Sequence, residues 1–192
     1  MPASATSATP TTMTADPSAW IVRWAHAVPA GGHVLDVACG RGRHAGYFAA
    51  LGHSVTAVDR DAAALAELPA AISTVCADIE SADWPLDPAM QFDAVLVTNY
   101  LFRPLLPRLV DCVAPGGVLL YETFAVGNER FGRPSNPDFL LRPGELLAAV
   151  DGKLRVIAYE DGRIETPRQA CVQRICAANP SSADACRYEL RP

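Results

Sequence analysis

Residues 33–61 read HVLDVACGRGRHAGYFAALGHSVTAVDRD, and the pattern of this stretch decides the fold. Val34, Leu35 and Val37 form the short apolar run that is typical of a strand buried on both faces of a parallel sheet. A turn with two glycines, a predicted helix and a second apolar run at residues 54–58 follow. This order of strand, turn, helix and strand predicts a βαβ unit that binds a nucleoside.

The turn after the first strand has glycines where the backbone must come close to a ligand. Gly40 and Gly42 lack a Cβ, so they allow both a sharp turn and a close contact. The helix predicted from about Arg43 would point its free N–H groups at the bound molecule. Asp59 ends the second strand, 19 residues after Gly40. A carboxylate at that spacing is placed to accept hydrogen bonds from both hydroxyls of a ribose.

Two classes of cofactor use this geometry. Gly40, Gly42 and Ala45 match the G-x-G-x-x-A form of the dinucleotide fingerprint. Asp36 favours the other class, because a carboxylate beside the turn would repel a pyrophosphate but attract the ammonium of an amino-acid ligand. The sequence therefore favours S-adenosylmethionine over NAD.

From about residue 31 to residue 177 the chain resembles the class I S-adenosylmethionine-dependent methyltransferases. Their first motif runs acid-x-Gly-x-Gly-x-Gly, and residues 36–42 read DVACGRG, with Ala38 in place of the first glycine. The resemblance implies an α/β fold: a doubly wound, Rossmann-like, seven-stranded sheet in three layers, mostly parallel with an antiparallel last strand. The GRGRH turn and the segment at residues 137–146 look most like the small tellurite-resistance or thiopurine-type branch.

The resemblance also implies which residues form the site. Asp78, after the third predicted strand, would contact the adenine amino group, and Ile79 would supply an apolar wall. The acceptor is expected beyond the fourth strand, near residues 98–103. The expected cofactor-binding residues are Asp36, Ala38, Cys39, Gly40, Gly42, Asp59, Arg60, Asp78, Ile79 and Asn99. The expected acceptor-binding residues are Tyr100, Arg103, Glu122, Phe124, Arg133 and Phe139.

Guanidinium groups and rings in the acceptor pocket could hold a small anion. The resemblance to the tellurite-resistance or thiopurine-type branch implies a small-molecule acceptor such as a thiol, a chalcogen oxyanion or similar. Methyl transfer from a sulfonium is an in-line displacement that mainly needs alignment of the two reactants. If the acceptor carries a proton, His44 and Glu122 are the candidate bases by position. A helix N-terminus disfavours a charged imidazole, so a packing role would also explain His44.

Two other functions stay open. One is an NAD(P)-dependent oxidoreductase, which the fingerprint ending in Ala45 would serve. The other is a non-catalytic methyltransferase-like protein that binds a nucleoside and acts as a scaffold or activator. Residues 98–101 read TNYL rather than the Asn-Pro-Pro-Tyr turn used on amino groups of nucleic acids, so nucleic acid is an unexpected substrate.

Length and composition limit what can be expected of the domain organisation, the partners and the location of the protein. The 192 residues suggest one domain over 16–178, between a disordered tail at 1–15 and a flexible tail at 179–192. Sixteen basic and 21 acidic side chains give a net charge of -5, which does not favour a polyanionic partner. Six cysteines show no metal-ligand spacing, so no metal is expected, and they indicate a reducing compartment. Without a secretory signal or spanning segment, a soluble cytoplasmic protein is expected; composition leaves the oligomeric state open.

Local patterns predict several element boundaries. Asp16 or Ser18 could cap the first helix. The Ala-Pro-Gly-Gly sequence at residues 114–117 predicts a turn before the fifth strand. The last two strands are expected to join through Asp161 and Gly162. The long segment 125–143, rich in Gly, Pro and Arg, predicts a lid over the site.

Overall fold

The computed structural model describes residues 16–81, 83–181 and 188–190. The tail expected at residues 1–15 lies outside the described residues, and the tail expected at 179–192 is described only in part. Asn179 is tied to the sheet, since its side chain donates to the carbonyl of Val113 at 2.8 Å. No helix in the described ranges is long and apolar enough to span a lipid bilayer.

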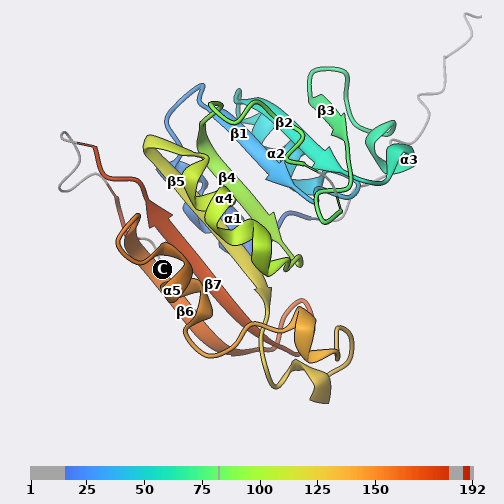
Figure 1. Ribbon diagram of the computed structural model, residues 1–192, viewed down its shortest axis with the longest axis vertical. Coiled ribbons are helices and arrows are strands. Elements are labelled where there is room, and N and C mark those ends of the chain that lie inside the picture. The colour runs from blue at the N-terminus through green and yellow to red at the C-terminus, as the bar shows by residue number, and fades with distance from the viewer. Residues whose placement is uncertain (1–15, 82, 182–187, 191–192) are drawn as a thin grey trace, which may run out of the picture.

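One seven-stranded sheet carries the fold, in the order β3-β2-β1-β4-β5-β7-β6 (Figure 1). Neighbouring strands from β3 to β5 pair in parallel, while β7 is antiparallel to both β5 and β6. This confirms the predicted sheet. The strands are β1 (His33–Val37), β2 (Ser54–Asp59), β3 (Ser73–Cys76), β4 (Phe92–Thr98), β5 (Val113–Phe124), β6 (Arg155–Ile164) and β7 (Ala170–Ala178).

Helices cover both faces of the sheet and complete three layers. On one face α4 and α5 pack over β4, β5 and β7, while α1 and α2 pack on the other (Figure 1). The helices are α1 (Ala19–Trp24), α2 (Arg43–Ala50), α3 (Ala62–Leu65), α4 (Leu106–Asp111) and α5 (Glu145–Val150). Four short 3-10 helices lie between them at Ala25–Ala27, Arg103–Leu105, Asn128–Arg130 and Pro137–Phe139.

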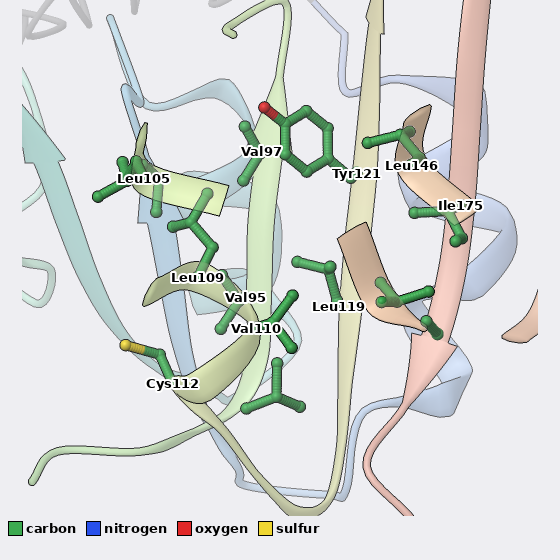
Figure 2. Packing of buried hydrophobic residues seen from close by; sticks show 14 of the residues in the cluster. Val95, Val97, Leu105, Leu109, Val110, Cys112, Leu119, Tyr121, Leu146 and Ile175 are labelled. Atoms are coloured by element: carbon green, nitrogen blue, oxygen red, sulfur yellow. The ribbon is translucent and has the colours of Figure 1, made fainter. Parts of the chain in front are cut away.

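Two apolar clusters hold these layers together. In the larger one Val97 of β4 and Tyr121 of β5 face Leu109 of α4 and Leu146 of α5 (Figure 2). The Tyr121 hydroxyl leaves this core at the carboxyl end of the sheet, where it donates to the carbonyl of Tyr100 at 2.8 Å. Burial on both faces explains why β4 and β5 read as continuous apolar runs.

Side-chain caps fix the starts of two helices, and the cap of the first was predicted. Ser18, rather than Asp16, is the N-cap of α1, with its Oγ accepting from the backbone N–H of Trp20. Asp61 caps α3 by accepting from the N–H groups of Ala63 and Ala64. Each cap satisfies backbone donors that have no partner inside the helix.

Two predicted turns differ from the structure. Residues 114–117 lie inside β5, where the register with β4 shifts. A Cβ on Gly117 would lie 2.8 Å from the carbonyl oxygen of Phe92, so only glycine fits this close approach. Asp161 and Gly162 do not form the last hairpin turn, because both pair with β7 inside β6.

The segment 125–143 is folded onto the end of the sheet. Asn128 is buried, and its side chain donates to the carbonyl of Pro134 at 2.9 Å and accepts from the N–H of Cys171 at 3.3 Å. Leu140 and Leu141 are buried at its far end. These contacts anchor the segment beyond the carboxyl end of β5, where a lid was predicted (Figure 1).

Candidate functional site

The carboxyl ends of the parallel strands meet at one edge of the sheet. Ala38 follows β1, Asp59 ends β2, Asp78 follows β3 and Asn99 follows β4. The strand order reverses between β1 and β4, and ligands of open α/β sheets bind at such a switch point.

A first cavity of about 150 Å³ lies at this edge. Its lining comes from the ends of β1 and β2 and from the loops after β3 and β4. The residues are Ala38, Asp59, Arg60, Ala77, Asp78, Ile79, Glu80 and Tyr100. Five of the predicted cofactor-binding residues are therefore together: Ala38, Asp59, Arg60, Asp78 and Ile79.

Asp59 joins the first cavity to the glycine turn. Its Oδ2 accepts from the N–H of Gly40 at 2.7 Å, and its Oδ1 accepts from the N–H of Asp61 at 2.9 Å. Each carboxylate oxygen has a second lone pair, so these bonds orient the group and leave acceptor capacity for ligand hydroxyls.

Asp78 is oriented by its own turn. Its Oδ1 accepts from the N–H of Glu80 at 3.0 Å, and this bond is the main reason that the pKa of the Asp78 carboxyl lies below its usual value. The charged form is therefore favoured. Ile79, which lies between Asp78 and Glu80 in the sequence, packs against the larger apolar cluster and gives the first cavity an apolar wall.

The backbone is strained where β1 and β4 end. Ala38 has φ 52° and Asn99 has φ 55°, and both are non-glycine residues with positive φ. Left-handed backbone at such residues costs free energy and is concentrated at functional sites. Ala38 thus keeps the glycine-like turn of the first motif although it has a Cβ.

A second cavity of about 220 Å³ shares Glu80 and Tyr100 with the first. It is mostly apolar and is partly closed by the segment 125–143. Its lining residues are Glu80, Asn99, Tyr100, Leu101, Thr123, Phe124, Pro134 and Phe139. The predicted acceptor residues Tyr100, Phe124 and Phe139 are brought together here, and Asn99 lies with them rather than in the first cavity.

Tyr100 lines both cavities. Its hydroxyl oxygen is buried and lies near the Glu80 carboxylate. Burial first, and then the nearby Glu80 carboxylate, raise the pKa of Tyr100, so the phenol stays protonated.

Asp36 is not at the mouth of the site, contrary to the prediction. The side chain is buried, and its Oδ2 accepts from the backbone N–H of Ala45 at 3.0 Å. Burial raises the pKa of Asp36 to about 7, while the bond to Ala45 and the charge of Arg43 act in the opposite direction. Asp36 thus ties β1 to the N-terminal turn of α2, and its carboxylate does not line either cavity.

The glycine turn shapes the site without lining it. Gly42 has φ 67°, and a Cβ there would lie 2.8 Å from the Leu68 side chain. Burial, with the charges of Asp36 and Asp59, raises the pKa of Cys39 to about 12, so its thiol stays protonated. Cys39, Gly40 and Gly42 are outside the lining of both cavities.

His44 lines neither of the two cavities. Its Nε2 accepts from the N–H of Ser18 at 3.1 Å, which leaves Nδ1–H to donate to the Thr98 hydroxyl at 3.3 Å. Burial, with the charge of Arg43, lowers the pKa of His44 to about 3. The ring is therefore neutral, and this geometry supports a role in joining α1, α2 and β4.

Glu122, the other candidate base, is also held by its neighbours. Its Oε1 accepts from the Ser18 hydroxyl at 2.8 Å, and its Oε2 lies 2.5 Å from Nε of Arg174 in an ion pair. Neither His44 nor Glu122 lines the two cavities. Side chains alternate along a strand, so Glu122 and the cavity-lining Thr123 point to opposite faces of β5.

The expected arginine clamp is absent from the second cavity. Arg103 instead binds Glu145 through two hydrogen bonds of 2.6 and 3.0 Å and donates to the carbonyls of Asp138 and Leu140. Arg133 does not line the cavity, although the next residue, Pro134, does.

Sequence reasoning missed Glu80, Leu101, Thr123 and Pro134, all of which line the second cavity. The sequence did contain an indication of Glu80, because Asp78-Ile79-Glu80 places a second acid just past the third strand. The Asx-type turn, in which Asp78 accepts from the N–H of Glu80, turns that acid toward Tyr100.

Comparison with known proteins agrees with this geometry. Residues 34–117 match a family model described as a methyltransferase domain. TehB from Haemophilus influenzae is 21% identical, with a TM-score of 0.65 over 81% of this chain and 60% of the TehB chain. This chain therefore spans less than two thirds of TehB. No curated protein matches the chain in sequence.

Two other solved structures match over most of their length. A TehB-like SAM-dependent methyltransferase from Corynebacterium glutamicum is 17% identical, with a TM-score of 0.61 over 83% of this chain and 86% of that one. The N-methyltransferase NodS from Bradyrhizobium japonicum is 16% identical, with a TM-score of 0.64 over 84% and 94%. The family match and the shared fold favour a methyltransferase over the oxidoreductase and non-catalytic alternatives. Residues 34–117 thus match a methyltransferase-domain family, and the chain shares its fold with solved S-adenosylmethionine-dependent methyltransferases.

Proposed function

We propose that this enzyme transfers a methyl group from S-adenosylmethionine to a small-molecule acceptor by in-line displacement. The observation that carries the proposal is the pair of cavities that meet at Glu80 and Tyr100. One cavity has the groups that a nucleoside needs, and the other is an apolar pocket of limited size. The shared lining residues place the two cavities next to each other, so ligands bound in them would be neighbours, as direct transfer requires.

The residues of the first cavity fit the nucleoside part of the cofactor. Asp59 would accept from the ribose hydroxyls, Asp78 would accept from the adenine amino group, and Ile79 would pack on the ring. When bound, S-adenosylmethionine supplies an activated methyl group, so the protein must mainly orient the reactants and exclude water.

The second cavity favours a small acceptor over a macromolecule. Its apolar walls, Leu101 and Phe124, are nearly buried, and the segment 125–143 contributes Pro134 and Phe139. Small-molecule sites are typically concave, mostly apolar and provided with a few polar groups.

Labelled methyl transfer tests the proposal. The enzyme is incubated with methyl-labelled S-adenosylmethionine and, separately, with the small-molecule, RNA and protein fractions of a cell extract. Label in the small-molecule fraction is expected, and label confined to RNA or protein would contradict the proposal.

Phe139→Ala refines the test of the acceptor site. The exposed Phe139 ring lines the second cavity only, so its removal should raise the acceptor KM several-fold and leave the affinity for S-adenosylhomocysteine unchanged. Phe131→Ala, on the same segment but outside the lining, is the matched control and should leave both constants unchanged.

A further inference from the structure

The charges around the second cavity bear on the chemical class of the acceptor. The two cavities together are lined by three carboxylates, Asp59, Asp78 and Glu80, and by one guanidinium, Arg60. Arg103, expected as an anion-binding group, is paired with Glu145, and Arg133 is outside the lining. Arg168 lies over the Phe124 ring at 5.2 Å from its centroid but does not line the cavity. In the lining of the second cavity Glu80 is the one charged residue, so the wall that an acceptor meets there is net negative.

The polar groups are concentrated at the shared wall. The buried Tyr100 hydroxyl lies beside the Glu80 carboxylate, whose charge and side-chain hydrogen bond are among the causes that raise the pKa of Tyr100. A carboxylate accepts hydrogen bonds only, and a phenol oxygen accepts as well as donates. An acceptor with several N–H donors and a positive charge satisfies both groups at once.

The bases near the second cavity also favour an amine acceptor. His44 and Glu122 are outside both linings and Tyr100 stays protonated, which leaves Glu80 as the base in the lining of the second cavity. A carboxylate is a weak base toward an alcohol, whose proton is far less acidic than that of an ammonium. A thiolate or an oxyanion would be repelled by the carboxylates. An amine loses a proton to water without a protein base and is then a neutral nucleophile.

On these grounds we infer that the acceptor is a primary or secondary amine on an apolar or aromatic body, held at its nitrogen by Glu80 and Tyr100. The inference rests on the proposed function. The bound ammonium releases one proton to water, and its lone pair then forms the N–C bond to the methyl carbon. The C–S bond breaks with its electron pair going to sulfur, which changes from a sulfonium to a neutral thioether. The methylated nitrogen is again cationic and remains matched to Glu80.

Binding of three matched ligands tests the inference without a known substrate. The enzyme is first titrated with S-adenosylhomocysteine, and failure of that titration would count against the proposed function itself. The saturated protein is then titrated by calorimetry with 2-phenylethylamine, 2-phenylethanol and 3-phenylpropionate, which share a ring and differ in the end group. The amine should bind at least tenfold more tightly than the carboxylate. Equal affinities, tighter binding of the carboxylate or no binding of any ligand would overturn the inference.

Glu80→Gln identifies the group responsible. This change keeps the side-chain shape and removes the charge, so the preference for amine over carboxylate should fall below threefold. Asp151→Asn, an exposed acid after α5, is the control and should keep the wild-type preference. A preference that survives Glu80→Gln would exclude Glu80 as the recognising group, and with it the inference.

Discussion

At the scale of single residues, Asp36 and Ala38 of the first motif shape the backbone of the site, Asp36 by a hydrogen bond and Ala38 by its positive φ. Asp36 supplies a carboxylate to the first turn of α2, where a negative charge and a hydrogen-bond acceptor are both favourable. Burial opposes this benefit and raises the pKa of Asp36 to about 7. Ala38 also has a free-energy cost, but it comes from the backbone, because a residue with a Cβ is strained in the left-handed region.

Asp36 should make stability depend on pH. Between about pH 4 and pH 7 the folded protein keeps a proton on Asp36 that the unfolded chain has lost, so this group lowers the free energy of unfolding as pH rises. Asp36→Asn removes the titration and keeps an acceptor for Ala45. Relative to wild type, the variant should gain on the order of 3 kcal/mol between pH 4 and pH 7.5. Urea unfolding at both pH values checks this, and a constant difference would contradict it.

Ala38→Gly should stabilise the protein by about 1 kcal/mol, because glycine adopts φ 52° without the cost that a Cβ brings. Ala63→Gly, in the α3 helix, is the matched control and should destabilise by about 1 kcal/mol. Chemical denaturation measures both changes. The same sign for the two variants would show that strain at Ala38 is not significant.

At the scale of elements, the guanidinium of Arg103 helps to hold the far end of the segment 125–143 over the second cavity. Arg103, from the 3-10 helix before α4, donates to the carbonyls of Asp138 and Leu140 and pairs with Glu145 at the start of α5. The pair is partly buried, so its hydrogen bonds are stronger than those of an exposed ion pair. Arg103 therefore positions Phe139 without touching the cavity.

Arg103→Ala should loosen this segment while the sheet stays intact. Losing charged hydrogen bonds should lower the local free energy of opening by about 2 kcal/mol. Hydrogen exchange should show faster exchange at residues 137–141 and little change in β1 and β4. Arg130→Ala, on the same segment, should leave these rates as in wild type, and equal effects of the two variants would refute the anchoring role of Arg103.

The sequence predicted elements better than directions of side chains. Apolar runs and the turn at residues 38–42 predicted the order of strands and helices, because the period of the apolar residues in a run shows which kind of element buries them. Asp36 and Glu122 were misplaced because strand residues alternate between two faces, and the sequence does not show which face bears the cavity. Arg103 was misplaced because its partner, Glu145, is 42 residues away.

At the scale of the whole molecule, the sheet brings short motifs that are far apart in the sequence to one edge. Asp59, Asp78 and Tyr100 follow three different strands, and parallel pairing alone sets them around the cavities. The spacing of the acids along the chain therefore predicted residues that line the first cavity. The acceptor side depends on how the segment 125–143 folds back, which has no periodic signal, so its net negative lining emerged only from the structure.

The most direct measurement is the affinity for S-adenosylhomocysteine of the wild-type enzyme and of Asp59→Ala, by titration calorimetry. Wild type should bind the ligand and show no comparable affinity for NAD. Asp59→Ala should bind it about 1.5 to 3 kcal/mol more weakly, the range for losing a charged hydrogen-bond partner. Unchanged affinity in Asp59→Ala, or tighter binding of NAD by wild type, would contradict placement of the S-adenosyl group in the first cavity.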